Sequence, residues 1–587
     1  MIFRLVLMVC LTVGISSDLG AAVSAQVETK PQAEELSAEE MKAKAKAEEA
    51  AREDEAVAQL DSWAQFQHQS VKQNASPVAH WGWRADSYTL WGTHSNRLIP
   101  VYTFGTKGAG KGIDLEDYTG KNSVYRDARG LQRLYGRIDE LSVNSEASYM
   151  DQTQVFEIQR AALESGKKNI ILVVFDGMDW QTTWAAAIAK HSKVPYREGR
   201  GTGLHFQDYN ANGTTQFSFM VTSPFCDEAV FDVNSQQVTG LEADTLMGGY
   251  NTVQAGDAPW SIAADLEYPV GKGVEVQHAY TDSASSATSM MSGIKTYNNA
   301  IGVDQNGRQA VSIAHAAQRL GYKVGVVSSV PVSHATPASA YAHNVTRNDY
   351  QDLTRDLLGL PSISHPSKPL PGLDVVIGGG YGTERDQDSG QGENFVPGNG
   401  YLADEDLAAV TKSKDNPHGK YVVARRTAGV DGSQQLLEKA ELAAANGDRL
   451  LGFYGANGNG GHLPFATADG DYRPVQGRSK SREEYEASDL EENPTLAEMT
   501  SAALTVLETG EQGFWLLVEA GDVDWANHDN NLDNSIGAVI SGDQAVKVLT
   551  DWVEKNSSWD ETVMIVTADH GHYLVIEDPE ALSKIGQ

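Results

Sequence analysis

Short apolar runs, rich in β-branched residues, recur along the chain and are separated by segments with helical periodicity. The runs occupy residues 169–175, 322–329, 374–380, 513–519 and 562–568, and the segments between them include RQAVSIAHAAQRL and PTLAEMTSAALTVLE. Runs that are apolar on both faces are typical of buried, mostly parallel strands. The alternation therefore predicts an α/β fold, with a doubly wound, mostly parallel sheet and helices on both of its faces.

Two long stretches interrupt this pattern. Residues 180–275 and 380–490 are rich in Gly, Asp and Asn and contain few strand-like runs. We interpret them as large loop insertions that decorate one domain, and the sequence shows no internal repeat. The domain is predicted to cover residues 76–587.

The segment before that domain has a different composition. Within residues 26–75, the part from residue 28 to about residue 60 is rich in Ala, Glu and Lys, and Ser37 and Glu40 have the spacing of a capping box. A helix here would be polar nearly all round. We predict a charged spacer, helical or flexible, and favour a solvated spacer over a tethering or partner-binding arm.

The first 25 residues have the features of a secretory signal peptide. Arg4 precedes the apolar run LVLMVCLTVGI, and small residues lead to a cleavage site before Gln26. The mature protein is therefore expected to be soluble and periplasmic or extracellular.

Because Cys10 lies within the apolar run, only Cys226 would remain, which excludes an internal disulfide. No later stretch has the roughly 18 uninterrupted apolar residues of a membrane span.

Charge narrows the class of ligand. The formal net charge is -33, with 41% hydrophobic and 21% charged residues. Nucleic acids and anionic membranes need a basic face, so neither is an expected partner. An anionic substrate would require local cations to overcome the global repulsion, and metals with an arginine would supply them.

Carboxylates lie at the ends of three of the predicted strands. Asp176 and Asp569 come shortly after apolar runs, and Glu519 ends another. The carboxyl ends of parallel strands are where open α/β sheets gather their ligand sites. One such acid could be a helix cap, but three at equivalent places, two with histidine nearby, predict a cluster of divalent metals. Imidazole with carboxylate suits zinc, whereas an all-oxygen set suits magnesium.

The motifs around these acids carry a family resemblance. They read FDGM, TDSASSAT, HATPASAYAH, EAGDVDWANH and TADHGH. Over roughly residues 169–572 the chain resembles the alkaline phosphatase family, whose members hold two zinc ions and one magnesium ion. The intervals within EAGDVDWANH match the family pattern, as does the interval from Thr336 to Arg347. The resemblance implies an alkaline phosphatase-like fold and hydrolysis of small phosphomonoesters.

The resemblance also implies which residues bind the three metals. It assigns Asp524 and His528 to the first zinc, Asp176, Asp569 and His570 to the second zinc, and Asp176, Thr336 and Glu519 to the magnesium. Two metals about 4 Å apart can hold both the entering and departing oxygens of an in-line phosphoryl displacement.

Ser283 and Arg347 are the candidate catalytic residues. A serine hydroxyl is a weak nucleophile until it is activated, and the second zinc would activate Ser283. Ser283 lies where TDSASSAT is predicted to enter a helix, and amides at a helix start favour phosphate. The alternative is that Asp282 and Ser283 only cap this helix. In the family this serine becomes phosphorylated, and Arg347 would hold two phosphate oxygens.

One family ligand is missing from its usual place. The first zinc of the family takes a further histidine from a strand downstream of the Asp-His pair, but only fifteen residues follow His572. The chain could be a truncated fragment, or the strand could have moved. The string THSNRLIPVYTFG, residues 93–105, has the family's interval between His94 and the Phe104-Gly105 pair. We therefore predict that His94 is the third protein ligand of the first zinc, by a circular permutation.

Three further residues are expected to tune the site. Trp525 and His334 occupy positions that vary within the family and affect phosphate affinity and magnesium binding. His572 is expected to orient the metal ligands. Acidic strings at residues 386–394 and 469–471 could bind calcium, although solvated turns are the favoured interpretation.

Two other functions compete with a phosphomonoesterase. One is a related metalloenzyme of the same superfamily, such as a phosphodiesterase, a sulfatase or a cofactor-independent phosphoglycerate mutase. TDSASSAT lacks the Pro and Arg of a sulfatase nucleophile, and Arg347 favours a terminal phosphate over a diester. The other is a non-catalytic phosphate or metal binder. Homodimers are common in the family, but this sequence does not establish one.

Overall fold

A computed structural model of the 587-residue chain describes residues 42, 44, 46, 52, 54–138, 140–261, 263–270, 278–456 and 460–587. The chain divides into two compact units, Met1–Ala56 and Val57–Gln587. Every strand that the structure describes, and each helix from α2 onward, lies in the second unit. The expected signal peptide and the capping box at Ser37 lie outside the described residues.

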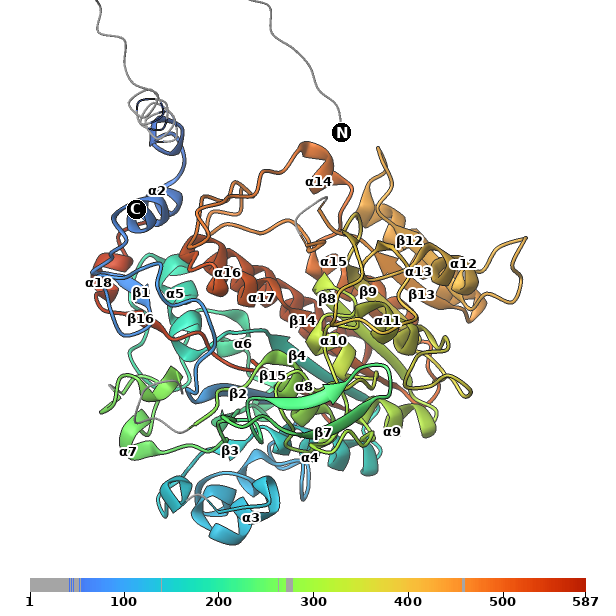
Figure 1. Ribbon diagram of the computed structural model, residues 1–587, viewed down its shortest axis with the longest axis horizontal. Coiled ribbons are helices and arrows are strands. Elements are labelled where there is room, and N and C mark those ends of the chain that lie inside the picture. Colours follow the sequence, from blue (N-terminus) through green and yellow to red (C-terminus); the bar gives the residue numbers. More distant parts are fainter. Residues whose placement is uncertain are drawn as a thin grey trace, which may run out of the picture. The chain divides into compact units, whose positions relative to one another are not determined.

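The strands are mostly short and buried (Figure 1). They are β1 (Ala79–Trp81), β2 (Ile99–Phe104), β3 (Met150–Asp151), β4 (Asn169–Phe175), β5 (Gln216–Val221), β6 (Ala229–Asp232), β7 (Gln237–Leu241), β8 (Lys323–Pro331), β9 (Val375–Gly379), β10 (Glu384–Arg385), β11 (Gly398–Asn399), β12 (Tyr421–Arg425), β13 (Arg449–Phe453), β14 (Phe514–Ala520), β15 (Thr562–Thr567) and β16 (Leu574–Ile576).

The helices connect and cover these strands. The α-helices are α2 (Ser62–Gln73), α3 (Ala128–Tyr135), α4 (Thr153–Glu164), α5 (Trp180–His191), α6 (His205–Asp208), α7 (Thr252–Ala255), α8 (Ser283–Ser292), α9 (Ile313–Arg319), α10 (Ala335–Ser339), α11 (Tyr350–Leu358), α12 (Asp404–Val410), α13 (Gly432–Asn446), α14 (Ala487–Glu491), α15 (Leu496–Leu507), α16 (Asp522–His528), α17 (Leu532–Asn556) and α18 (Pro579–Leu582). Short 3-10 helices are η1 (Leu115–Asp117), η2 (Gly120–Asn122), η3 (Val124–Arg126), η4 (Glu140–Ser142), η5 (Ala211–Gly213) and η6 (Tyr268–Val270).

Within the described part of the chain, one ten-stranded sheet forms the centre of the second unit. Its order is β12-β13-β9-β8-β14-β4-β15-β2-β5-β3, and the strands from β12 to β15 run parallel. Every residue of β4, β14 and β15 is buried, so both faces of the sheet are covered. The α/β fold with a mostly parallel sheet, predicted from the two-sided apolar runs, is confirmed.

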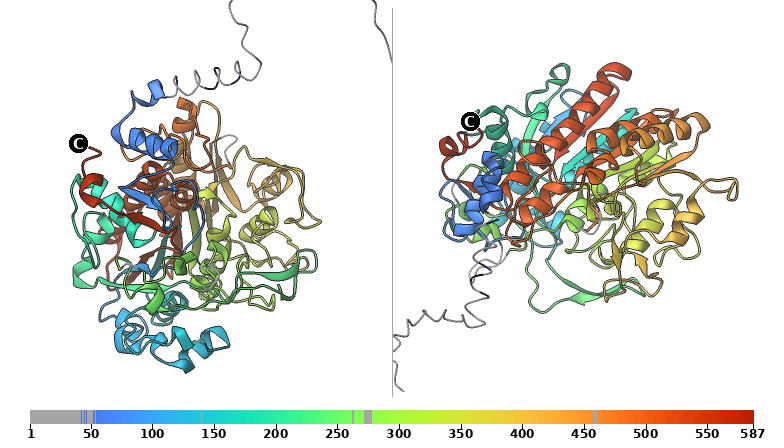
Figure 2. Two further views of the ribbon diagram at one scale, coloured as in Figure 1. Left: turned by 60° about the vertical axis from the view of Figure 1, so that its left-hand side comes forward. Right: turned by 90° about the horizontal axis from the view of Figure 1, so that it is seen from above.

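Two layers of helices cover the sheet (Figure 2). Helices α13, α15, α17 and α5 pack in a row, and α17 contacts β4 while α15 contacts β8. Helices α4, α8, α9 and α10 form a second group, in which α4 contacts β4 and α9 contacts β8. The helices of each group pack mainly within their own group, although both groups contact the same strands, so the groups lie on opposite faces, as a doubly wound sheet requires.

The stretches interpreted as insertions contribute more to the sheet than the sequence suggested. Residues 180–275 supply β5, and residues 380–490 supply β12 and β13 with the intervening helix α13. β12 lies at an edge, and most of β5 is only half-buried. β5 (QFSFMV), β12 (YVVAR) and β13 (RLLGF) carry apolar residues, but each is only five or six residues long and lies within a stretch rich in Gly, Asp and Asn, where the sequence analysis passed over it.

The compact unit begins at Val57, before the predicted domain start at residue 76. Asp61 caps α2 by accepting a hydrogen bond from Trp63 N at 2.6 Å. One face of α2 is buried, with Trp63 in an apolar cluster that also contains Leu582. Gln67 Oε1 accepts a hydrogen bond from Leu532 N at 2.9 Å. Helix α2 therefore stabilises the start of α17.

The strand after His94 lies beside the last long strand. β2 pairs antiparallel with β15, with Tyr102 opposite Val566 and Phe104 opposite Met564. An isolated bridge joins Ser95 to Gly571. Segments near the two ends of the second unit are thus hydrogen-bonded to each other.

The sequence analysis expects no membrane span after residue 25 and no internal disulfide. Among the helices that the structure describes, none combines the length and the apolar character needed to cross a lipid bilayer. Cys226 is a buried free cysteine.

A buried ion pair links β3 to the segment after α8. Lys295 Nζ lies 3.1 Å from Asp151 Oδ2, and both side chains are inaccessible to solvent. Asp151 also accepts hydrogen bonds from Tyr125 Oη at 2.7 Å and from Thr153 N at 2.9 Å. Removal of one partner from such a pair leaves the other charge uncompensated.

Asp151→Asn is expected to destabilise the protein by about 3–5 kcal/mol, because Lys295 would remain buried without its counter-charge. The midpoint of urea unfolding measures this loss. Glu561→Gln is the matched control, since the Lys168–Glu561 pair at 2.7 Å is half exposed. The control substitution should lower the free energy of unfolding by less than about 1 kcal/mol. Equal effects for the two variants would contradict the prediction.

Candidate active site

Three buried carboxylates meet at the carboxyl ends of adjacent strands. Asp176 follows β4, Glu519 lies in β14, and Asp569 comes two residues after β15. Both β14 and β15 pair with β4, and Glu519 and Thr567 both lie opposite Val174. Burial raises the pKa of Asp176 well above its usual range, and the neighbouring carboxylates add to the shift. A cluster of this kind needs compensating positive charge.

The residues predicted for the second zinc lie together. His570 Nε2 is 3.4 Å from Asp176 Oδ1 and 3.4 Å from Asp569 Oδ2. These three residues form a group whose potential ligand atoms lie within 4.8 Å of one another. Asp569 Oδ1 accepts a hydrogen bond from Gly177 N at 2.9 Å, so the orientation of the carboxylate is fixed.

The residues predicted for the first zinc also lie together, including His94. His94 Nε2 is 3.1 Å from His528 Nε2 and 3.8 Å from Asp524 Oδ1. His528 Nε2 is 3.4 Å from Asp524 Oδ1. His528 Nδ1 lies 2.8 Å from the carbonyl oxygen of Gly92, so it donates there, and Nε2 presents its lone pair to the cluster.

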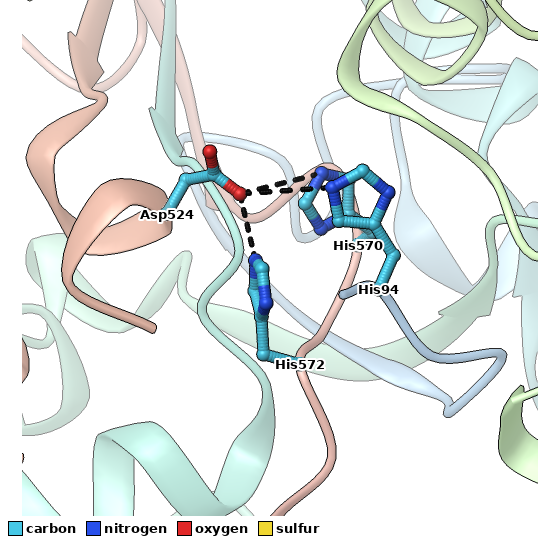
Figure 3. A group of neighbouring side chains, drawn as sticks. All are labelled: His94, Asp524, His570 and His572. Atoms are coloured by element: carbon cyan, nitrogen blue, oxygen red, sulfur yellow. Dashed lines mark hydrogen bonds and ion pairs between the residues drawn. The ribbon is translucent and has the colours of Figure 1, made fainter. Parts of the chain in front are cut away.

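Asp524 is the centre of a wider group (Figure 3). His94, Asp524, His570 and His572 also offer atoms within 4.8 Å of one another, and their side chains converge on the Asp524 carboxylate. His572 Nε2 lies 2.7 Å from Asp524 Oδ1. A hydrogen bond at this position orients the carboxylate, in keeping with the role predicted for His572.

The oxygens predicted for magnesium share one property. Asp176 Oδ2, Thr336 Oγ1 and Glu519 Oε1 are all buried without a hydrogen-bond partner, and so is Asp569 Oδ2. Burial raises the pKa of Glu519 to about 8 and that of Asp569 to about 6. Buried polar groups are normally paired, so orphaned oxygens that converge on one place fit a bound cation.

Burial favours the neutral form of three of the histidines. Burial lowers the pKa of His94, His570 and His572, most strongly for the first two. Neutral imidazoles keep a lone pair for a metal. The donor set therefore fits zinc at the imidazole and carboxylate groups and magnesium at the oxygens of Asp176, Thr336 and Glu519.

Ser283 is the first residue of α8, as predicted. Its Oγ lies 3.4 Å from Asp176 Oδ1 and 3.2 Å from His570 Nε2. Asp282 caps the helix by accepting a hydrogen bond from Ser285 N at 2.9 Å. The other oxygen of Asp282 lies 3.0 Å from Arg347 Nη1. Asp282 therefore both begins the helix and holds the arginine.

An open pocket of about 530 Å³ gives access to these groups. The predicted residues on its wall are His94, Ser283, His334, Arg347, Asp524, Trp525 and His528. The rings of His334 and Trp525 meet edge to face, with centroids 5.6 Å apart. Asp176, Thr336, Glu519, Asp569, His570 and His572 are buried.

The sequence analysis missed four residues of the pocket wall. They are Asn348, Tyr350, Arg478 and Asp529. Arg478 comes from the stretch interpreted as an insertion, and its Nε donates to the carbonyl oxygen of His528 at 3.0 Å. A lone arginine in a polar stretch carries no signal of its own. Tyr350 and Asn348, by contrast, could have been found from their closeness to Arg347.

The acidic strings considered for calcium form turns. Asp388 Oδ1 accepts a hydrogen bond from Gly390 N at 2.7 Å. Asp471 Oδ1 accepts from Arg473 N at 3.0 Å. Such contacts between an Asp side chain and a nearby backbone amide are typical of turns.

The family model described as alkaline phosphatase matches residues 260–582, more than half of the chain. The chain belongs to the alkaline phosphatase family. The matched range contains Ser283, Arg347 and the ligands from Thr336 onward. Asp176 and His94 precede that range, so their assignment depends on the geometry described above.

Curated members of the alkaline phosphatase family match part of the chain. Alkaline phosphatase 3 of Bacillus subtilis (strain 168) is 28% identical over 290 residues, which cover 49% of this chain and 49% of the relative. The alkaline phosphatase of Escherichia coli (strain K12) is 32% identical over 308 residues, covering 51% of this chain and 60% of the relative. The matches thus span about half or slightly more of these relatives.

A solved structure is also similar. The cold-active alkaline phosphatase from the psychrophile Shewanella sp. is 21% identical, with a TM-score of 0.40, over 69% of this chain and 68% of that chain.

Proposed function

We propose that this protein is an exported, metal-dependent phosphomonoester hydrolase that releases inorganic phosphate through a phosphoserine intermediate. The observation that carries the proposal is the position of Ser283 Oγ, 3.4 Å from Asp176 Oδ1 and 3.2 Å from His570 Nε2, on the wall of an open pocket. Membership of the alkaline phosphatase family supports it. Export rests on the sequence before Gln26, and N-terminal sequencing of the secreted protein tests it.

The proposed cofactors are two zinc ions and one magnesium ion. His94, Asp524 and His528 would hold one zinc, Asp176, Asp569 and His570 the other, and Asp176, Thr336 and Glu519 the magnesium. When bound, these ions supply positive charge that polarises phosphoryl oxygens and acidifies a hydroxyl or water in contact with them.

The side chains of the protein place the substrate and carry the phosphoryl group. Ser283 Oγ forms a bond to phosphorus while the bond from phosphorus to the alcohol oxygen breaks. Water then displaces Oγ, which frees Ser283 and releases inorganic phosphate. Two in-line displacements retain the configuration at phosphorus. The amides at the start of α8 favour the phosphoryl group at this position.

Arg347 is proposed to bind two oxygens of the phosphoryl group. Its guanidinium is fixed by Asp282 at 3.0 Å and lies on the pocket wall. A planar fork of donors matches a phosphate bidentately, whereas an ammonium group does not. A terminal phosphate offers more unsubstituted oxygens than a diester, so this contact favours monoesters.

Arg347→Lys is expected to raise the KM for a phosphomonoester roughly 10- to 100-fold, because a charge-assisted hydrogen bond contributes about 1.5–3 kcal/mol. Steady-state kinetics and inhibition by inorganic phosphate measure the effect. Arg319→Lys, at an exposed position on α9, is the matched control and should leave KM unchanged. An unchanged KM in the Arg347 variant would remove the arginine from phosphate recognition.

One assay tests the proposed function as a whole. Purified full-length protein is given a chromogenic aryl phosphate or its bis-aryl diester, with and without a chelator, and zinc and magnesium are then restored. We expect hydrolysis of the monoester, little hydrolysis of the diester, loss of activity with chelator and recovery with metal. Preferred hydrolysis of the diester would point to a phosphodiesterase. No hydrolysis of either would point to a phosphate or metal binder.

The strand that begins after His94 is proposed to have moved from the end of the chain to its beginning, relative to the family. The support is the antiparallel pairing of β2 with β15 and the 3.1 Å separation of His94 Nε2 from His528 Nε2. Closeness of the two ends of a domain makes such a permutation physically reasonable.

A further inference from the structure

A second group of potential metal ligands shares no residue with the active-site clusters. It consists of His343, Asp356 and His365, whose ligand atoms lie within 4.8 Å of one another. His343 lies between α10 and α11, Asp356 is in the last turns of α11, and His365 is in the loop that follows. His343 Nδ1 is 3.0 Å from His365 Nε2, and His365 Nε2 is 3.7 Å from Asp356 Oδ2.

The surrounding hydrogen bonds orient these groups toward one another. His343 Nε2 lies 2.8 Å from the carbonyl oxygen of Ala310, so it carries the proton and donates it. His343 Nδ1 therefore presents its lone pair to His365. A backbone carbonyl that fixes the tautomer in this way is typical of metal-binding histidines. Asp356 Oδ1 accepts a hydrogen bond from Ser362 Oγ at 2.6 Å, which fixes the carboxylate.

The charge balance favours a cation at this position. Asp356 is 1% exposed, and in the part of the chain that the structure describes, its ion-pair partner is His365 and no lysine or arginine. Asp352 and Asp349 lie on the same segment, and Arg355 is shared between Asp352 and Asp406. Burial and these carboxylates raise the pKa of Asp356 well above its usual range. A buried carboxylate is costly unless a positive charge compensates it.

We propose that His343, Asp356 and His365 bind a divalent transition metal of the zinc class. Two imidazoles with one carboxylate are a zinc donor set, whereas calcium and magnesium prefer oxygen alone. Ligands at about 2.0–2.1 Å from a tetrahedral centre lie roughly 3.3 Å apart. The two measured separations, 3.0 and 3.7 Å, lie on either side of that value. The His365 side chain is 12% exposed, which gives the ion a path from solvent.

The site would brace the loop that carries Arg347. His343 precedes Arg347 in that loop, and Asp356 follows it on α11. Other contacts hold the same loop, including Tyr297 Oη to the carbonyl oxygen of Val345 at 2.8 Å. A metal that joins His343 to Asp356 would connect the two ends of this segment. Its role is therefore structural, and it lies apart from the reaction proposed above.

A hydrogen bond between the two imidazoles is the competing explanation for their 3.0 Å contact. The number of zinc ions per chain distinguishes a metal site from a hydrogen bond between the imidazoles. The wild-type protein and the variants His365→Gln, Asp356→Asn and His418→Gln are saturated with Zn²⁺, desalted, and analysed by mass spectrometry for zinc per chain. His418 is exposed, so its variant is the matched control.

We expect the wild type and His418→Gln to hold one more zinc per chain than His365→Gln and Asp356→Asn. Because Asp356 is buried, Asp356→Asn is compared only once circular dichroism shows a native fold, whereas His365 is near the surface and its variant is expected to fold. Equal zinc content in wild type and His365→Gln would overturn the proposal.

A double variant shows which metal is lost. If His94 and His365 bind different zinc ions, the double variant His94→Ala/His365→Gln should hold two fewer zinc ions per chain than the wild type. Each single variant should hold one fewer. A single lost equivalent in the double variant would mean that His365→Gln disturbs the active-site zinc, and would also overturn the proposal. Because the readout is metal content, the result does not depend on whether the chain hydrolyses phosphomonoesters.

Discussion

Ser283→Ala is expected to lower turnover of a phosphomonoester by roughly a thousandfold or more, since loss of a nucleophile removes the covalent route. The alanine side chain has no oxygen to receive the phosphoryl group, and the 3.2 Å contact with His570 Nε2 disappears. Turnover is measured with a chromogenic aryl phosphate at saturating substrate. Intact-protein mass spectrometry after an acid quench should detect a phosphorylated wild-type chain and an unmodified variant.

Ser289→Ala is the matched control for Ser283→Ala. Ser289 lies on the same helix, is equally buried, and donates a hydrogen bond to the carbonyl oxygen of Ser285 at 2.9 Å. Its loss should leave turnover within a few-fold of wild type. Zinc content should be unchanged in both variants, which separates loss of the nucleophile from loss of metal. If Ser283→Ala keeps a tenth of the wild-type turnover, Ser283 is not the nucleophile.

His94→Ala is expected to lower turnover by roughly a hundredfold or more and to remove one zinc per chain. Loss of a residue that only orients a metal ligand typically costs about 10- to 100-fold, and loss of a ligand should cost at least as much. His94 Nε2 lies 3.1 Å from His528 Nε2 and 3.8 Å from Asp524 Oδ1, the position of a third ligand of the same ion. Turnover at low zinc and mass spectrometry of the metal content measure the two effects.

Added imidazole provides a sharper test of His94. If the variant lacks only a ligand, imidazole in solution should restore part of the turnover of His94→Ala and none of that of Ser283→Ala. His418→Ala should behave as wild type, because His418 is exposed. Full turnover of His94→Ala at low zinc would contradict both the ligand assignment and the proposed relocation of the strand.

The sequence predicted the central strands of the sheet and missed those toward its edges. β4, β14 and β15 are buried on both faces, so each reads as a continuous apolar run that polar side chains do not interrupt. β5 is only half-buried over most of its length, and β3 is two residues long. β3 is too short to leave a pattern, whereas the apolar residues of β5 (QFSFMV) were passed over because the surrounding stretch is rich in Gly, Asp and Asn.

The residues of the candidate site also fall into those that the sequence predicts and those that it does not. Ligands that follow a strand directly, such as Asp176, could be predicted because the sheet brings strand ends together. Arg478 could not, because a loop places it in the pocket and its neighbours there are distant in the sequence. The group of His343, Asp356 and His365 was not predicted. His343 ends the motif HATPASAYAH, but Asp356 and His365 belong to no motif, and the three meet only through the turn after α11.

The pairing of β2 with β15 determines when the metal centre can form. His94 precedes β2, whereas Asp524 and His570 come from the far end of the polypeptide, so their assembly depends on contacts of very large sequence separation. Such contacts form late in folding, since their loop entropy must be overcome first. On the ligand assignment proposed above, zinc uptake at His94 should therefore report completed folding, and a partly synthesised or still unfolded chain would be unable to retain that ion.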